Sequence, residues 1–102
     1  MMKMMVFIFR ESLTEEIHEF LKNQNVDAFT EILSVEGTGL GGRALGTLNW
    51  PGHNSLILTA VPADEANRIA ANFADRRNAL QEAQHGADIP MKLFVLPVDQ
   101  AI

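Results

Sequence analysis

Four short apolar runs are spaced along the chain, and each has the pattern of a β-strand. They occupy residues 4–9 (MMVFIF), 28–36 (AFTEILSVE), 56–61 (LILTAV) and 92–96 (KLFVL). The first and third runs are continuously apolar, which is typical of central strands buried on both faces. The second run alternates loosely and is rich in β-branched and aromatic residues. Because Phe29, Leu33 and Val35 share a parity within it, we expect them on one face of the sheet.

Two segments between these runs carry apolar side chains at helical spacing. The first begins at Ser12, which has capping-box spacing to Glu15, and the second spans residues 64–84. Their stripes consist of Leu13, Ile17, Phe20 and Leu21 in the first segment, and of Ala66, Ile69, Ala70, Phe73 and Leu80 in the second. Arg76 and Arg77 are expected on a solvated face. Arg77 also falls on the second stripe, and if it turns inward we expect it to pair with a carboxylate.

The order of these elements predicts one ferredoxin-like βαββαβ domain over residues 1–102. Such a domain contains the same βαβ unit twice. Right-handed crossovers place both helices on one face of a four-stranded antiparallel sheet. The other face is then left uncovered, with apolar side chains that need a cover. Association with further copies of the chain is the simplest cover, so we expect a homo-oligomer.

Charge and composition exclude several classes of protein. The net charge is −5, whereas binding to nucleic acid needs a positive surface, so we expect no nucleic-acid partner. The absence of cysteine excludes disulfides and thiolate metal sites. No apolar run approaches the roughly 20 residues that span a bilayer, and residues 1–9 do not form a secretory signal. We therefore expect a soluble, cytoplasmic protein without direct membrane insertion.

The strongest local anomaly is a glycine-rich segment at residues 37–54, which holds six of the seven glycines. Its glycines match G-x-G-x-x-G after a strand, but no helix can begin there, so a dinucleotide-binding fingerprint is rejected. A plain connector between two strands is one interpretation. A loop of this length in a compact domain is more often functional, and this one carries the only tryptophan. The residues proposed to dock a partner are Arg43, Trp50, His53 and Asn54.

Three short motifs, in order, resemble the P-II nitrogen-regulatory proteins and especially their divergent P-II-like branch. Residues 92–98 (KLFVLPV) are similar to that family's last strand, and residues 35–39 (VEGTG) to the beginning of its T-loop. Residues 61–65 (VPADE) are similar to the start of its second helix. The order and spacing of the motifs agree over nearly the whole chain.

The resemblance implies a ferredoxin-like homotrimer that acts as a signalling protein and not as an enzyme. In this family, clefts between subunits bind adenine nucleotides, and the flexible T-loop reports occupancy to a transporter or enzyme. The divergent branch is often linked to metal-efflux or inorganic-carbon systems, so a membrane transporter is the implied partner. Residues carried over to nucleotide binding are Gly37, Thr38 and Gly39 at the loop, His85 and Gly86 in the turn before the last strand, and Lys92. No cofactor is required.

The turn before the last strand departs from the family pattern. It reads HGADIPM at residues 85–91, so side chains replace glycines, and Asp88 is expected to repel a phosphate. The basic residue that the family has just before the third strand is also missing. We therefore expect an adenosine monophosphate or diphosphate, or another small anion, rather than a triphosphate.

Two other functions stay open on the residues alone. A trimer could gather three copies of His53 or His85 around one axis, and imidazole suits zinc or nickel. This would give a trimeric divalent-metal-binding protein of similar fold, like the divalent-cation-tolerance proteins, although the spacing assigns no metal ligand. The other alternative is a dimeric ferredoxin-like regulatory domain that binds an amino acid. Catalysis lacks support, because no serine has the G-x-S-x-G context of a nucleophile.

Overall fold

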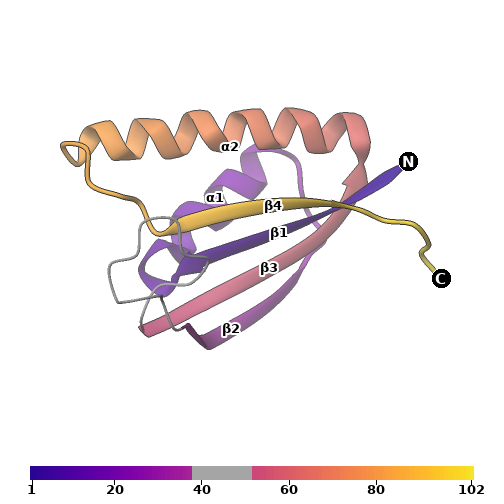
Figure 1. The fold of residues 1–102 in the computed structure, drawn as a ribbon, viewed down its shortest axis with the longest axis horizontal. Coiled ribbons are helices and arrows are strands. Elements are labelled where there is room, and N and C mark those ends of the chain that lie inside the picture. Colours follow the sequence, from indigo (N-terminus) through magenta and orange to yellow (C-terminus); the bar gives the residue numbers. More distant parts are fainter. Residues whose placement is uncertain (38–51) are drawn as a thin grey trace.

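The computed structural model describes residues 1–37 and 52–102. Its elements are the strand β1 (Met2–Arg10), the 3-10 turn η1 (Glu11–Leu13), the helix α1 (Thr14–Asn23), the strands β2 (Thr30–Gly37) and β3 (Gly52–Pro62), the helix α2 (Ala63–Ala83) and the strand β4 (Met91–Pro97) (Figure 1). The sheet has the order β2-β3-β1-β4, and all neighbouring strands are antiparallel. The predicted ferredoxin-like βαββαβ fold is therefore confirmed.

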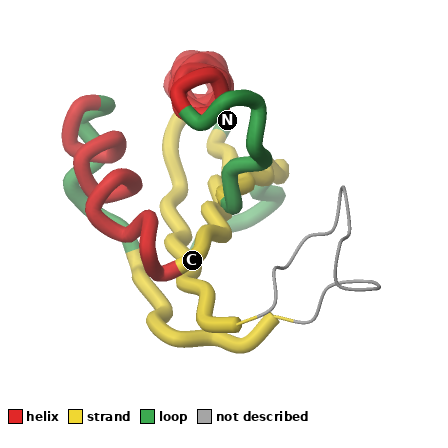
Figure 2. The backbone as a smooth tube through the Cα atoms, turned by 90° about the vertical axis from the view of Figure 1, so that its left-hand side faces the viewer, coloured by secondary structure: helices red, strands yellow, loops and turns green. Residues whose placement is uncertain are grey.

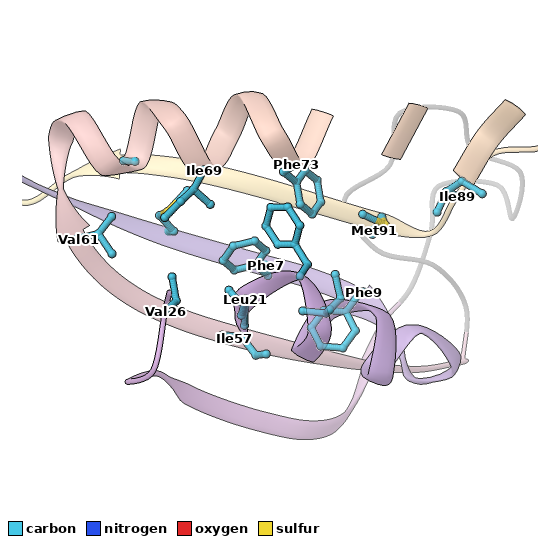
Figure 3. Close-up of a cluster of buried hydrophobic side chains, with 14 residues drawn as sticks. Phe7, Phe9, Leu21, Val26, Ile57, Val61, Ile69, Phe73, Ile89 and Met91 are labelled. Carbon is cyan, nitrogen blue, oxygen red and sulfur yellow. The ribbon is translucent and has the colours of Figure 1, made fainter. Parts of the chain in front are cut away.

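Both helices cover the same side of the sheet, where the core lies (Figure 2). Strand residues alternate between the two sides, and Met5, Phe7 and Phe9 of β1 are fully buried beneath the helices. Phe7 contacts Phe73 of α2 edge-to-face, with ring centroids 5.7 Å apart (Figure 3). It also contacts Phe20 of α1 edge-to-face, with ring centroids 6.4 Å apart. These three rings join the sheet and both helices in one apolar core.

The other side of the sheet, called the open side from here on, is covered by neither α1 nor α2, the two α-helices among residues 1–37 and 52–102. Its positions are even-numbered in β1, β3 and β4, and their apolar side chains stay partly accessible. They include Met4, Val6, Ile8, Leu56, Leu58 and Phe94, with Ile32 and Leu96 44% and 45% exposed. A contiguous apolar surface of this kind is uncommon on soluble monomers. Within the part of the chain that the structure describes, one face of the sheet is therefore left without a helix, as predicted.

The start of the first helix differs from the prediction. Ser12 lies inside η1, and α1 begins at Thr14 after Leu13, which makes no side-chain capping bond. The Thr14 hydroxyl instead donates to the Glu11 carbonyl at 2.8 Å. The capping box of Ser12 and Glu15 is therefore wrong, because the 3-10 turn moves the N-cap from Ser12 to Leu13.

A β-bulge in β2 breaks the predicted parity of its apolar side chains. Ile32 pairs with Leu56 but Val35 pairs with Asn54, so the register of β2 against β3 shifts between these two residues. Ser34, in the bulge, has a φ of 54°, and its hydroxyl donates to the Glu11 carboxylate. Val35 consequently shares the open side with Ile32, and the expectation that it lies on the face of Phe29 and Leu33 is wrong.

An ion pair ties the two helices together on their outer surface. The Arg76 guanidinium of α2 donates from Nε and Nη2 to both carboxylate oxygens of Glu16 in α1, at 2.7 and 2.8 Å. These bonds hold the pKa of Glu16 below its ordinary value of 4.5. Arg76 therefore lies at the surface as predicted. Within the described part of the chain, no helix is both long and apolar enough to cross a bilayer.

Candidate functional site

Four strand ends meet at one end of the sheet, called the loop end from here on. β1 and β2 finish there at Arg10 and Gly37, and the antiparallel strands β3 and β4 begin there at Gly52 and Met91. The predicted nucleotide-binding residues Gly37 and Lys92 both belong to this end. The antiparallel topology therefore brings the ends of the glycine-rich segment and of the turn before β4 to one region of the domain.

Gly37 and Lys92 nevertheless lie on opposite edges of the sheet. Gly37 is in the edge strand β2 and Lys92 is in the edge strand β4, with β3 and β1 between them. Since neighbouring strands are about 4.8 Å apart, these residues are separated by at least about 14 Å within one chain. A single phosphate therefore cannot lie against the backbone of both residues in one subunit. Packing of the β2 edge of one subunit beside the β4 edge of another would bring the two residues closer together.

The turn after α2 is built around two left-handed residues. His85 and Gly86 have φ values of 58° and 86°, and the Gly86 N–H donates to the Gln81 carbonyl at 2.9 Å, which closes the helix. Glycine adopts such a conformation without strain, which explains its presence at position 86. Both residues are exposed. The resemblance to P-II proteins implies that these two residues bind phosphate, and that role stays a prediction.

Asp88 in the same turn is already paired with a cation. The Arg77 Nη2 group of α2 donates to its carboxylate at 2.6 Å and to the Ile89 carbonyl at 3.0 Å. Arg77 Nε also donates to the Met91 carbonyl at 3.1 Å. The prediction that an inward-turned Arg77 would pair with a carboxylate is confirmed. The negative charge of Asp88, expected to repel a phosphate, is thus offset within the chain.

A second cation, which the sequence analysis did not single out, lies beside Lys92. Lys92 pairs with Ile8 across β1 and β4, so Arg10, two residues further along β1, occupies the diagonal position about 7–8 Å away on the open side. The Arg10 N–H also donates to the Pro90 carbonyl at 3.0 Å, which joins the end of β1 to the turn. The sequence signal was available, since Arg10 has the parity of the open-side residues Val6 and Ile8.

The proposed docking residues fall in two groups. Arg43 and Trp50 lie outside the described residues, as do Thr38 and Gly39 of the predicted nucleotide site. His53 and Asn54 were expected in the loop, but β3 begins at Gly52, because its ladder with β2 continues to the Gly37–Gly52 pair. His53 is exposed opposite Glu36, whereas Asn54 is 1% exposed. The docking role stays a prediction.

A metal site receives no support from the geometry. Among residues 1–37 and 52–102, no three potential His, Asp or Glu ligands lie close enough together to hold a metal ion. A hollow of about 420 Å³ between α1 and α2 is lined by Glu16, Gln24 and Arg76 among others. Its Arg76 is already bonded to Glu16, so we assign no anion to it.

Sequence comparison finds no matching family model and no similar curated protein. Solved structures share the fold. The apo form of CPII from Thiomonas intermedia K12, a nitrogen regulatory P-II-like protein, superposes with a TM-score of 0.64 at 19% identity, over 92% of this chain and 85% of that one. CPII bound to ADP, AMP and acetate gives 0.65 at 17% identity, over 93% and 83%. A proposed P-II-like signalling protein from Thermus thermophilus gives 0.56 at 21% identity, over 92% and 83%. The resemblance to P-II-like proteins is confirmed at the level of the fold.

Proposed function

We propose that this protein is a P-II-like sensor: a homotrimer that binds an adenine nucleotide in clefts between its subunits and signals occupancy to another protein. The observation that carries the proposal is the placement of Gly37 and Lys92 at the same end but on opposite edges of the sheet. Two subunits together would supply the loop edge and the cationic edge of one cleft. Neither edge alone would enclose a nucleotide.

The open side supports assembly of the subunits. Its apolar strand residues have no cover within the described part of the chain, and a domain of 102 residues gains stability by burying such a surface against copies of itself. A contact that places the β2 edge of one subunit beside the β4 edge of the next is head-to-tail. Such a contact closes into a ring when it is repeated around a rotation axis. A ring of three is the assembly that the P-II resemblance implies.

The ligand we propose is ADP or AMP. CPII, which shares this fold, is described in complexes with ADP and AMP. In this chain the phosphates would meet the cations Lys92 and Arg10 of one subunit, beside the exposed turn residues His85 and Gly86, and residues 37–39 of the next. Two cations on each subunit's cleft edge suit a monophosphate or diphosphate better than a triphosphate. Nucleotide binding here is sensing, with no catalytic residue and no required cofactor.

Signal output is assigned to residues 38–51 together with His53. Arg43 and Trp50 combine a cation with a large aromatic side chain, the residue types that most often dominate protein–protein contacts. The ligand would lie beside Gly37, where this segment begins. Occupancy of the cleft would therefore bias how the segment meets a partner, which we propose to be a membrane transporter or a cytoplasmic enzyme.

Calorimetric titration with AMP, ADP and ATP tests the proposal. We expect micromolar dissociation constants for AMP or ADP and weaker binding of ATP. Lys92→Ala should lower the affinity for ADP by about 10- to 100-fold, since a charge-assisted hydrogen bond contributes about 1.5–3 kcal/mol to the binding free energy. Lys22→Ala is the matched control, because Lys22 is an exposed lysine in the last turn of α1 and should leave ADP binding unchanged. Absence of heat with all three nucleotides contradicts the proposed function.

A further inference from the structure

We propose that Arg77 is a positioning residue for the anion site: its guanidinium fixes the turn before β4 and cancels the charge of Asp88, so that Lys92 and the turn can accept a phosphate. This inference rests on the proposed function and deepens it. It assigns a role to a residue that would not itself touch the ligand. It also explains how a turn that contains a carboxylate can serve an anion site.

The position of Arg77 on α2 is unusual for a charged residue. Ile69, Phe73 and Arg77 follow one another at four-residue steps along the stripe that faces the sheet, and the first two belong to the core. The Arg77 side chain is only 21% exposed. A long apolar residue at this step would extend the core, but it would offer no donor to the turn that lies beneath this part of α2.

The guanidinium of Arg77 makes its contacts with three residues of one short segment. It reaches the Asp88 carboxylate, the Ile89 carbonyl and the Met91 carbonyl, at 2.6, 3.0 and 3.1 Å. A guanidinium is planar and presents its donors in a fixed fork, so several simultaneous bonds set the orientation of the segment as well as its position. Lys92 follows Met91 directly. The orientation of its backbone is therefore set partly by Arg77.

The turn is also held from the side of the sheet. The backbone N–H of Arg10 in β1 donates to the Pro90 carbonyl. Within the turn, the backbone N–H of Met91 donates to the Ile89 carbonyl at 2.7 Å. Residues 88–91 are thus fixed between α2 on one side and β1 on the other. A binding element held in this way loses little conformational freedom when a ligand arrives, which favours affinity.

The electrostatic part of the role concerns Asp88. Its side chain is 51% exposed and lies four residues before Lys92, so an unpaired carboxylate there would oppose the field of the lysine. With Arg77 at 2.6 Å the pair carries no net charge. Removing only Arg77 therefore exposes an incoming phosphate to repulsion, whereas removing both charges does not. This difference separates the proposed role from a general contribution to folding.

ADP titration of four variants tests the inference. Arg77→Gln should lower the affinity for ADP by about tenfold. The double variant Arg77→Gln/Asp88→Asn should recover at least half of the lost binding free energy. Asp88→Asn alone should change the affinity by less than about threefold. Arg68→Gln is the matched control, since Arg68 is another half-exposed arginine of α2 that bonds Gln24 far from the turn. It should bind ADP as the wild type does.

Hydrogen–deuterium exchange without nucleotide gives a second readout. Arg77→Gln should speed amide exchange in residues 88–92 and leave exchange in residues 2–6 of β1, far from the turn, unchanged. If this variant does not fold, Arg77→Lys replaces it, with an intermediate affinity expected because lysine keeps the charge but not the fork. The inference is overturned if Arg77→Gln binds ADP like the wild type, or if the double variant binds no better than the single one. Wild-type protein that binds no ADP would instead overturn the proposed function, and the inference with it.

Discussion

Val6→Glu should convert the proposed trimer into folded single chains. Val6 lies in the central strand β1 on the open side, between Leu58 of β3 and Phe94 of β4. In the trimer this position would be covered by another subunit, so a glutamate there would bury a charge without a partner, at a cost of several kcal/mol. In a single chain the same side chain reaches solvent, so the fold should survive.

Light scattering coupled to size-exclusion chromatography measures this effect. The wild type should elute with three times the mass of one chain, and Val6→Glu with the mass of one chain and an unchanged circular dichroism spectrum. Ala71→Glu, at an exposed position of α2, is the matched control and should stay trimeric. A Val6→Glu protein that keeps the wild-type mass would show that the open side is not the interface.

Phe7→Ala should destabilise the domain by about 3–5 kcal/mol, because a large buried ring is lost and a cavity remains. Phe7 is fully buried and contacts Phe20 and Phe73 edge-to-face, so it links the central strand to both helices. Domains of this size are stable by about 5–15 kcal/mol in total. The variant should therefore unfold at a much lower urea concentration, or fail to fold at physiological temperature.

Urea denaturation of single chains provides the comparison. In the Val6→Glu background, the stability of Phe7→Ala is compared with that of Phe94→Ala. The second substitution also removes a phenyl ring, but from the open side, where Phe94 pairs with position 6. We expect the Phe94 variant to lose clearly less stability than the Phe7 variant, since its ring is only partly buried in a single chain. Equal losses in the two variants would contradict the assignment of the core to the helix-covered side.

The fold was predictable because the pattern of each element agrees with its place in the sheet. The apolar runs at residues 4–9 and 56–61 became the two central strands, but they are not fully buried on both faces: burial alternates along β1 because the helices cover only one face of the sheet. Details that depend on a single local choice were not predictable. The 3-10 turn before α1 shifts the start of the helix, and the bulge at Ser34 shifts the register of β2 against β3. Neither shift can be recognised from the hydrophobic periodicity of the sequence.

The candidate site was predictable only in part. Gly37 and Lys92 were identified from short motifs, but their separation on opposite edges of the sheet follows from strand order, which the motifs do not state. Asp88 was read as a source of repulsion because its partner Arg77 is 11 residues away in sequence and is brought to it by the fold. Arg10 was missed because its closeness to Lys92 depends on the register of β1 against β4, which parity alone does not give.

Native mass spectrometry of the protein with ADP tests the central claim most directly, since it reports the number of subunits and of bound nucleotides in one spectrum. Our account predicts an assembly of three 11.3 kDa chains that carries up to three ADP molecules, one for each cleft. A spectrum of single chains, or of trimers that take up no ADP at millimolar concentration, would contradict it.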